Sequence, residues 1–313
     1  MRLTILATAS ILLLNACSKS PLSTNKGPYD INASFDHQGT NRTYTIHLPK
    51  NYYTSTTLKF PVVFALHGGF GSAANMASLT GLNAKADSAG FIVVYPEGEE
   101  NPSAARTWNA GNCCGANSGI KNTDDVGFIS RLADTMIARY QGNSKKIYAT
   151  GHSNGAMMCY RLASELSGKI TAIAPNAGAF QMKTAYTPVR NVPVLHIHSL
   201  LDENAKYNGG KSKNYVLTGL DNVPVDSCLN VVASVAGCTA LKQTVSTTSL
   251  YTVYKWSTCT DANFEVLLYL TNDGGHSWPG GTPSLTGLDT DPASQAFKNN
   301  DVIWAFFSKY SLP

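Results

Sequence analysis

The sequence predicts an α/β protein with a mostly parallel central sheet and helices on both faces. Near-continuous apolar runs, such as residues 60–66, are typical of strands that are buried on both faces of a sheet. Segments with helical spacing alternate with these runs, which favours parallel strands joined by crossover helices. One strand, residues 147–150, leads through Gly151–Gly155 directly into a helix. This junction is typical of the same fold class.

The first residues predict export and a lipid anchor. Residues 3–14 are apolar, but they are fewer than the roughly 20 that span a bilayer. The tetrapeptide Leu14-Asn15-Ala16-Cys17 matches a bacterial lipobox, which predicts a signal peptide over 1–16 and lipidation of Cys17. The alternative is an ordinary signal peptide with an incidental cysteine. We therefore expect a location in the bacterial cell envelope, lipid-anchored at the periplasmic or outer surface, or secretion.

The rest of the chain predicts a tether and one domain. Residues 17–28 are polar and form the tether, and residues 29–313 hold the alternating strands and helices. The formal net charge of +4 is spread without a run of basic residues, which gives no reason to expect nucleic acid as a partner. Membrane contact is expected through the anchor alone.

Strands are predicted where apolar or alternating runs end at turn residues. Residues 29–37 and 43–48 alternate, which predicts an antiparallel pair joined through Gln38–Thr40. Buried strands are predicted over 60–66, 91–95, 147–150, 170–174 and 192–197, and further strands over 250–256 and 264–270.

Helices are predicted by apolar residues at helical spacing. Gly90 ends a helix over 75–89, and Asp125 is the expected N-cap of a helix over 126–140. Further helices are predicted directly after Ser153 and over 227–235 and 291–310. The two long connections, 99–123 and 203–225, are predicted to be irregular.

Gly151-His152-Ser153-Asn154-Gly155 between a strand and a helix has the pattern of a nucleophile elbow. The two glycines permit a reversal with no room for a Cβ, and they hold Ser153 in a sparsely populated conformation. A chance match to three fixed positions is the alternative. The flanking strand and helix favour the elbow, with Ser153 as the nucleophile.

A serine nucleophile needs a histidine that accepts its proton and an acid that orients the histidine. In this fold the chain order is serine, acid, histidine. Only His196, His198 and His276 follow Ser153. His196 and His198 end a buried strand, which favours a structural role, with metal ligation by the pair as a minor alternative. His276 lies on a glycine-rich loop after the last strand, so we expect it to be the base.

Asp202 is the expected acid. It directly follows the strand over 192–197, at the carboxyl edge of the sheet where active sites of open α/β folds collect. Its neighbour Glu203 is the competing candidate.

Two backbone N–H groups should bind the oxyanion. Asn154, which follows the nucleophile, supplies one. The second should come from the His67-Gly68-Gly69 loop; Gly69 is the first candidate and Phe70 the alternative.

Three further residues are candidates for the substrate-binding walls. Trp108 and Trp278 lie on loops, and a core position is the alternative for both. His152, next to the nucleophile, is expected to line the pocket without taking part in the chemistry. The pattern implies neither a metal nor another cofactor.

The motifs together resemble the polyhydroxybutyrate depolymerase/feruloyl esterase family of α/β hydrolases, in a lipoprotein form. They are LHGG, TWNAGNCCG, DDVGF, GHSNGAMM, HIHSLLDE and GGHSWPGG, within residues 40–310. The resemblance implies the α/β-hydrolase fold, hydrolysis of carboxylic esters by Ser153, Asp202 and His276, and a disulfide between Cys238 and Cys259. The turn after the acid, Glu203-Asn204-Ala205-Lys206, lacks the proline usual in the family, so the substrate rim there is expected to differ.

The residues and the resemblance predict a cofactor-free serine esterase. Its expected substrates are feruloyl or acetyl esters of plant polysaccharide, or short hydroxyalkanoate esters. No separate binding module is visible, which favours small or oligomeric esters. A serine peptidase and a non-catalytic glycan-binding lipoprotein are the alternatives. The residues leave open the pairing of Cys113, Cys114, Cys159 and Cys228.

Overall fold

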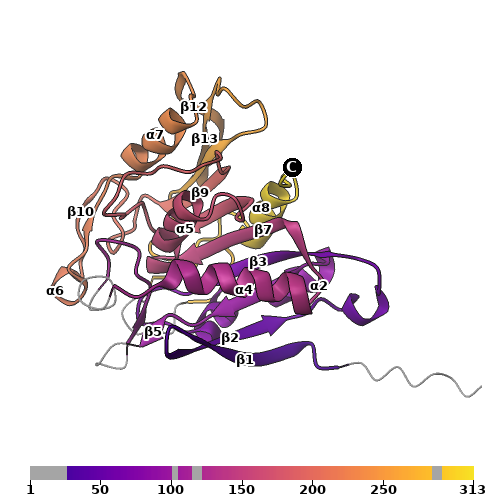
Figure 1. The fold of residues 1–313 in the computed structure, drawn as a ribbon. Coiled ribbons are helices and arrows are strands. Elements are labelled where there is room, and N and C mark those ends of the chain that lie inside the picture. The colour runs from indigo at the N-terminus through magenta and orange to yellow at the C-terminus, as the bar shows by residue number, and fades with distance from the viewer. Residues whose placement is uncertain (1–26, 101–104, 115–121, 284–290) are drawn as a thin grey trace, which may run out of the picture.

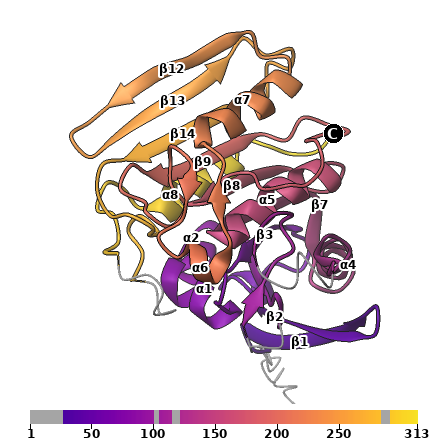
Figure 2. The same ribbon diagram turned by 90° about the vertical axis from the view of Figure 1, so that its left-hand side faces the viewer.

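The computed structural model describes residues 27–100, 105–114, 122–283 and 291–313. One ten-stranded sheet has the order β1-β2-β4-β3-β7-β8-β9-β14-β13-β12. The six strands from β4 to β14 are parallel, and antiparallel strands flank them at both edges, as Figures 1 and 2 show. The strands are β1 Asp30–His37, β2 Thr40–His47, β3 Phe60–Leu66, β4 Ile92–Pro96, β7 Gly142–His152, β8 Ala172–Asn176, β9 Val194–Ser199, β12 Ala240–Thr247, β13 Tyr251–Ser257 and β14 Val266–Thr271.

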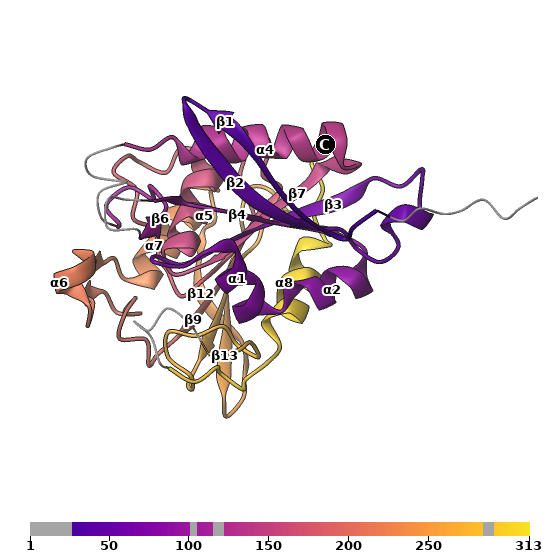
Figure 3. The same ribbon diagram turned by 90° about the horizontal axis from the view of Figure 1, so that it is seen from below.

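Helices cover both faces of the sheet, as predicted (Figure 3). On one face lie α4 (Asp125–Arg139), α5 (Asn154–Glu165) and α7 (Val225–Val235). On the other lie α1 (Ala73–Thr80), α2 (Leu82–Ala89) and α8 (Asn299–Phe307). Smaller elements are a 3₁₀ turn, Tyr52–Thr54, the helix α6, Tyr215–Thr218, and the pairs β5 Glu99–Glu100 with β6 Arg106–Thr107 and β10 Gly210–Lys211 with β11 Asp221–Asn222.

The central strand β3 shows why its sequence is a continuous apolar run. Phe64 and Leu66 pack into the core beneath α4 and α5, whereas Val63 and Ala65 pack into the core beneath α1 and α8. Because successive side chains point to opposite faces, both sets must be apolar in a sheet covered on both sides.

The first hairpin begins its second strand earlier than predicted. Gln38 and Gly39 both have positive φ, 53° and 79°, and form a two-residue turn that pairs His37 with Thr40. Such turns match the right-handed twist of the strands they join. The ladder therefore starts at residue 40 rather than 43.

Two helix predictions need correction at their ends. The predicted helix over 75–89 is divided at Gly81, whose φ of 60° ends α1, and α2 then begins. The N-cap of α4 is Asp124, which accepts a hydrogen bond from the N–H of Gly127 at 2.9 Å. Asp125 is instead buried in the first turn, where it forms an ion pair with Arg42.

The later segments differ more from the prediction. The connection 203–225, expected to be irregular, contains β10, α6 and β11. The last helix starts at Asn299 rather than near residue 291. The segment before it folds back on the loop after β14: Gly280 N–H donates to Ser294 O, and Asn299 N–H to Pro279 O. The edge strand β12 was not predicted, because most of its side chains are polar and most of those described are exposed.

The structure pairs Cys238 with Cys259, as the family resemblance implies, and it also joins the adjacent Cys113 and Cys114. Cys159 and Cys228 are buried free thiols.

The Cys238–Cys259 bond closes a loop with a sequence separation of 21. Replacing both cysteines with serine should lower the free energy of unfolding by about 3 kcal/mol, because a cross-link of this span restricts the unfolded chain. Urea unfolding of the oxidised protein and of the double variant measures the difference. An unchanged midpoint and slope would contradict a stabilising bond.

The predicted signal peptide and Cys17 lie outside the described residues. Within the ranges that are described, no helix is both long and apolar enough to cross a bilayer.

Candidate active site

The turn between β7 and α5 forces Ser153 into a strained conformation. Its φ is 56° and its ψ −119°, which non-glycine residues rarely adopt. A Cβ on Gly151 would lie 2.5 Å from the carbonyl oxygen of Gly155, and one on Gly155 would lie 2.3 Å from that of Leu66. Both glycines are therefore required by close backbone contacts. Gly178 carries no sequence motif, but it is required too, since a Cβ there would lie 2.3 Å from the Ser153 carbonyl oxygen.

Asp202 follows β9 and is buried behind the site. Its Oδ1 accepts hydrogen bonds from the N–H groups of Asn204 at 2.9 Å and Ala205 at 2.7 Å, and its Oδ2 lies 2.8 Å from His276 Nδ1. Burial alone would raise the pKa of Asp202, but His276 and the backbone donors outweigh it and hold the pKa below its usual value. The competing candidate Glu203 is exposed and lies 3.2 Å from Lys206 Nζ.

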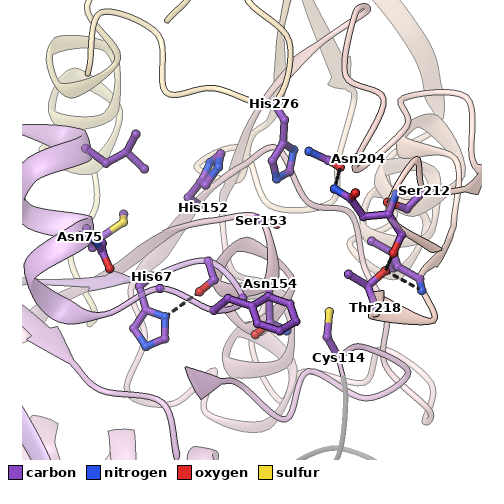
Figure 4. A pocket seen from close by; sticks show the side chains of 18 residues that line it. His67, Asn75, Cys114, His152, Ser153, Asn154, Asn204, Ser212, Thr218 and His276 are labelled. Atoms are coloured by element: carbon purple, nitrogen blue, oxygen red, sulfur yellow. Dashed lines mark hydrogen bonds between the residues drawn. The ribbon is translucent and has the colours of Figure 1, made fainter. Parts of the chain in front are cut away.

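His276 lies on the loop after β14, in a position fixed by its backbone. Its N–H donates to Asp291 Oδ2 at 2.7 Å. The preceding Gly275 has a φ of 118°, and a Cβ at this residue would lie 2.3 Å from the same carboxylate oxygen. The carboxylate of Asp202 holds the proton on Nδ1, so Nε2 is the basic nitrogen. Ser153 and His276 line one cavity, shown in Figure 4.

The backbone favours Gly69 over Phe70 as the second oxyanion donor. The N–H of Phe70 donates to Arg106 O at 2.8 Å, whereas Gly69 N–H has no backbone acceptor among the described residues. Asn154 begins α5, so its N–H has no acceptor within the helix. Its side chain is fixed by the backbone of Trp108, whose N–H donates to Asn154 Oδ1 at 2.6 Å.

A family model described as Esterase PHB depolymerase matches residues 42–251. The chain belongs to this family. The match confirms the resemblance of the sequence motifs at family level and, with it, the predicted class of carboxylic ester hydrolase.

Curated relatives of this family member are esterases by name. It is 32% identical over 182 residues to the bifunctional acetylxylan esterase/xylanase XynS20E of Neocallimastix patriciarum, covering 57% of this chain and 24% of that one. It is 27% identical to the putative esterase NocK of Nocardia uniformis subsp. tsuyamanensis, covering 75% and 72%. It is 29% identical to feruloyl esterase B of Piromyces equi, covering 49% and 28%. The chain thus spans about a quarter of the first and third relatives.

Among solved structures, the acetyl xylan esterase from Aspergillus awamori superposes with a TM-score of 0.62 and 16% identity. The superposition covers 90% of this chain and 99% of that one. It confirms the α/β-hydrolase fold.

In this esterase-family structure the two candidate tryptophans are core residues, which corrects the expectation that they form substrate walls. Trp108 and Trp278 are fully buried, and neither lines the cavity. Trp108 Nε1 donates to His67 O at 2.9 Å, and Trp278 Nε1 donates to Asn300 Oδ1 at 3.1 Å. Each indole N–H thus has a partner within the protein, as buried tryptophans require.

The cavity has two chemically different sides. Apolar side chains come from the first glycine loop and α1: Phe70, Met76 and Leu79. The segment after Asp202 contributes mainly polar side chains, Asn204, Ser212, Asn214 and Thr218, with Leu220 at its end. Sequence reasoning missed the polar side, because nothing in residues 203–225 indicates that they return to the site.

His152 lines the cavity, as expected. Asn176 Nδ2 lies 3.0 Å from His152 Nδ1 and 2.9 Å from Ser277 O, so it donates to both. His152 is therefore neutral with its proton on Nε2. Burial and the nearby His276 hold its pKa well below the usual value.

His196 and His198 form a buried hydrogen-bonded chain that ends at the acid loop. His198 Nε2 lies 2.6 Å from Ala205 O, so it must donate and leave Nδ1 as an acceptor. His196 Nε2 donates to His198 Nδ1 at 2.9 Å, and His196 Nδ1 then accepts from the Tyr160 hydroxyl at 2.7 Å. Burial lowers the pKa of both histidines. The structural interpretation of this pair thus fits its contacts.

Acid should destabilise this protein through its buried histidines. Burial lowers the pKa of His67 to about 4, with Nδ1 bonded to Gly68 O and Nε2 accepting from Gly98 N–H. Between pH 6.5 and 4 the unfolded chain binds a proton here that the native chain does not, so the free energy of unfolding falls as pH falls. The expected loss for His67 alone is about 3 kcal/mol by pH 4. The lowered pKa of Asp202 acts in the same direction.

Urea unfolding at pH 7, 5.5 and 4.5 measures this dependence, and His67→Asn should flatten it. A free energy of unfolding that stays constant or rises toward pH 4.5 would contradict the neutral state of these histidines.

Proposed function

We propose that the protein is a serine esterase in which Ser153, His276 and Asp202 form the catalytic triad. The observation that carries this proposal is the His276–Asp202 pair, 2.8 Å apart, on the same cavity as a serine in a strained strand-to-helix turn. The family membership and the esterase names of the relatives support it.

In the first half-reaction Ser153 Oγ attacks the ester carbonyl carbon while His276 Nε2 takes its proton. The oxyanion accepts hydrogen bonds from the N–H groups of Gly69 and Asn154. The carbon–oxygen bond to the alcohol then breaks, and His276 gives the proton to the departing oxygen. In the second half-reaction water attacks the acyl-enzyme, again with His276 as the base, and frees Ser153 and the acid. No step requires a cofactor, and Asp202 stays ionised throughout.

The proposed substrates are acetyl or feruloyl esters carried by plant polysaccharide, with short hydroxyalkanoate esters as the other substrate class of the family. The relatives named acetylxylan esterase and feruloyl esterase support the first class. The polar side of the cavity also fits a polar alcohol better than a polyester chain.

A substrate panel tests the proposal. Initial rates on methyl ferulate, acetylated xylan and hydroxybutyrate oligomers are compared at equal ester concentration. We expect hydrolysis of acetylated xylan or methyl ferulate to be at least about tenfold faster than that of the oligomers. The reverse order would assign the hydroxyalkanoate class, and no hydrolysis of any ester would refute the esterase.

We also propose that residues 1–16 are a lipoprotein signal peptide, that Cys17 carries the lipid and that 17–28 tether a single catalytic domain, 29–313, to a bacterial envelope membrane. Cys17→Ser should move most of the protein from the detergent phase to the aqueous phase in a Triton X-114 partition of expressing cells, because the acyl chains are lost. Equal partition of the wild type and the variant would contradict lipidation.

A further inference from the structure

The polar side of the cavity begins at the loop of the catalytic acid. Figure 4 shows Asn204, Ser212 and Thr218 on one side of the cavity, opposite Asn75 and His152. The N–H of Asn204 donates to Asp202 Oδ1 at 2.9 Å, so this residue is tied to the carboxylate that holds His276. The polar side therefore lies next to the base.

Hydrogen bonds within the segment fix these side chains before any substrate arrives. Asn214 Nδ2 donates to Asn204 Oδ1 at 2.7 Å, and Asn222 Nδ2 donates to Asn204 O at 3.1 Å. The N–H of Asn214 donates to Ser212 Oγ at 3.1 Å. A site whose groups are held in place loses little conformational entropy when it binds a ligand.

Two donors on this side are left without a protein acceptor. Asn204 Oδ1 and Ser212 Oγ each accept a hydrogen bond from Asn214. Within the described residues, the Asn204 Nδ2 hydrogens and the Ser212 hydroxyl hydrogen have no acceptor. Both residues are more than nine-tenths buried, at 8% and 6% exposure. Thr218 differs, because its hydroxyl donates to Asn214 O and accepts from Leu220 N–H, both at 3.1 Å.

Both donors belong to residues that line the same cavity as Ser153 and His276, and Asn204 lies next to His276 in Figure 4. Because His276 gives its proton to the departing alcohol oxygen, that alcohol must lie beside His276 and so near Asn204. An alcohol with oxygens next to the ester satisfies both donors. An aryl or alkyl alcohol leaves them unpaired once water is displaced, and such sites discriminate against ligands that lack the acceptor.

We propose that Asn204 Nδ2 and the Ser212 hydroxyl form a subsite for the alcohol of the substrate, and that this alcohol is a sugar unit with a hydroxyl adjacent to the esterified position. The subsite rests on the proposed esterase function. It assigns the specificity for the alcohol part of the ester to two residues of the 203–225 connection.

The test compares two esters that share the acetyl group and differ in the alcohol. These are an acetylated xylo-oligosaccharide and p-nitrophenyl acetate, with kcat and KM measured for the wild type, Ser212→Ala, Asn204→Ala and the matched control Thr218→Val. Each of the first two variants should lower kcat/KM on the oligosaccharide about three- to tenfold and on p-nitrophenyl acetate less than about twofold. Thr218→Val should leave the ratio of the two kcat/KM values unchanged.

Equal losses on both esters for Ser212→Ala and Asn204→Ala would overturn the subsite, since they would indicate a disturbed acid loop. A ratio that also changes in Thr218→Val would overturn the assignment to the two donors. A wild type that hydrolyses p-nitrophenyl acetate but not the oligosaccharide overturns the sugar subsite and leaves the esterase standing. Hydrolysis of neither ester overturns the subsite for an acetylated sugar, and it refutes the esterase itself if methyl ferulate and the hydroxybutyrate oligomers are not hydrolysed either.

Discussion

Ser153→Ala should lower kcat for p-nitrophenyl acetate on the order of a millionfold, to the rate left by binding and the oxyanion donors alone. Without the Oγ nucleophile there is no acyl-enzyme, and His276 has no hydroxyl proton to accept. The N–H groups of Gly69 and Asn154 stay in place, which accounts for the residual rate. Initial rates measured at high enzyme concentration, with the wild type diluted in parallel, give the ratio.

The variant should fold as the wild type does. Alanine in the same turn has the same positive φ, and removing a hydroxyl leaves the Gly151 and Gly155 contacts unchanged. Circular dichroism and urea unfolding verify this, and Ser257→Ala, at a half-buried serine bonded to Gln243, is the matched control. Hydrolysis by Ser153→Ala at more than about one per cent of the wild-type rate would exclude Ser153 as the nucleophile.

The parts of the site that could be predicted from sequence are those that local geometry dictates. The elbow is a contiguous pentapeptide, and its two glycines are required by contacts within a few residues and with the adjacent strand β3. Asp202 and His276 each follow a parallel strand directly, and the carboxyl ends of parallel strands meet at one edge of the sheet. Spacing and strand order therefore sufficed to place both beside the elbow.

The rest of the cavity lining could not be predicted, because it depends on contacts between distant segments. Trp278 lies on a loop two residues from His276, so its position in the sequence suggests a substrate-binding wall. In the structure its indole is buried, and its N–H donates to Asn300 Oδ1. Asn204 and Ser212 carry no motif, and only the folding of α6 and β10–β11 brings them to the cavity. Likewise β12, at an exposed edge, needs no apolar pattern to pair with β13.

Asp202→Asn should lower kcat roughly ten-thousandfold while KM changes little. The Oδ1 of Asp202 accepts two backbone N–H groups, so an asparagine at this position keeps its oxygen there and turns its amide nitrogen toward His276 Nδ1. An amide N–H is a donor, so Nδ1 must become an acceptor and the imidazole proton must move to Nε2. Nε2 of His276 then carries a proton and has no lone pair with which to accept the proton of the Ser153 hydroxyl.

Glu203→Gln is the matched control for this change, since Glu203 is the neighbouring carboxylate and is paired at the surface with Lys206. It should retain kcat within about twofold. If Glu203→Gln were the damaging change and Asp202→Asn the harmless one, the acid would have been misassigned. If Asp202→Asn lost activity only together with its fold, the defect would lie in the loop that Asn204 and Ala205 close onto the carboxylate. Because asparagine retains both of those hydrogen bonds, we expect the variant to unfold at the same urea concentration as the wild type, with the loss confined to kcat.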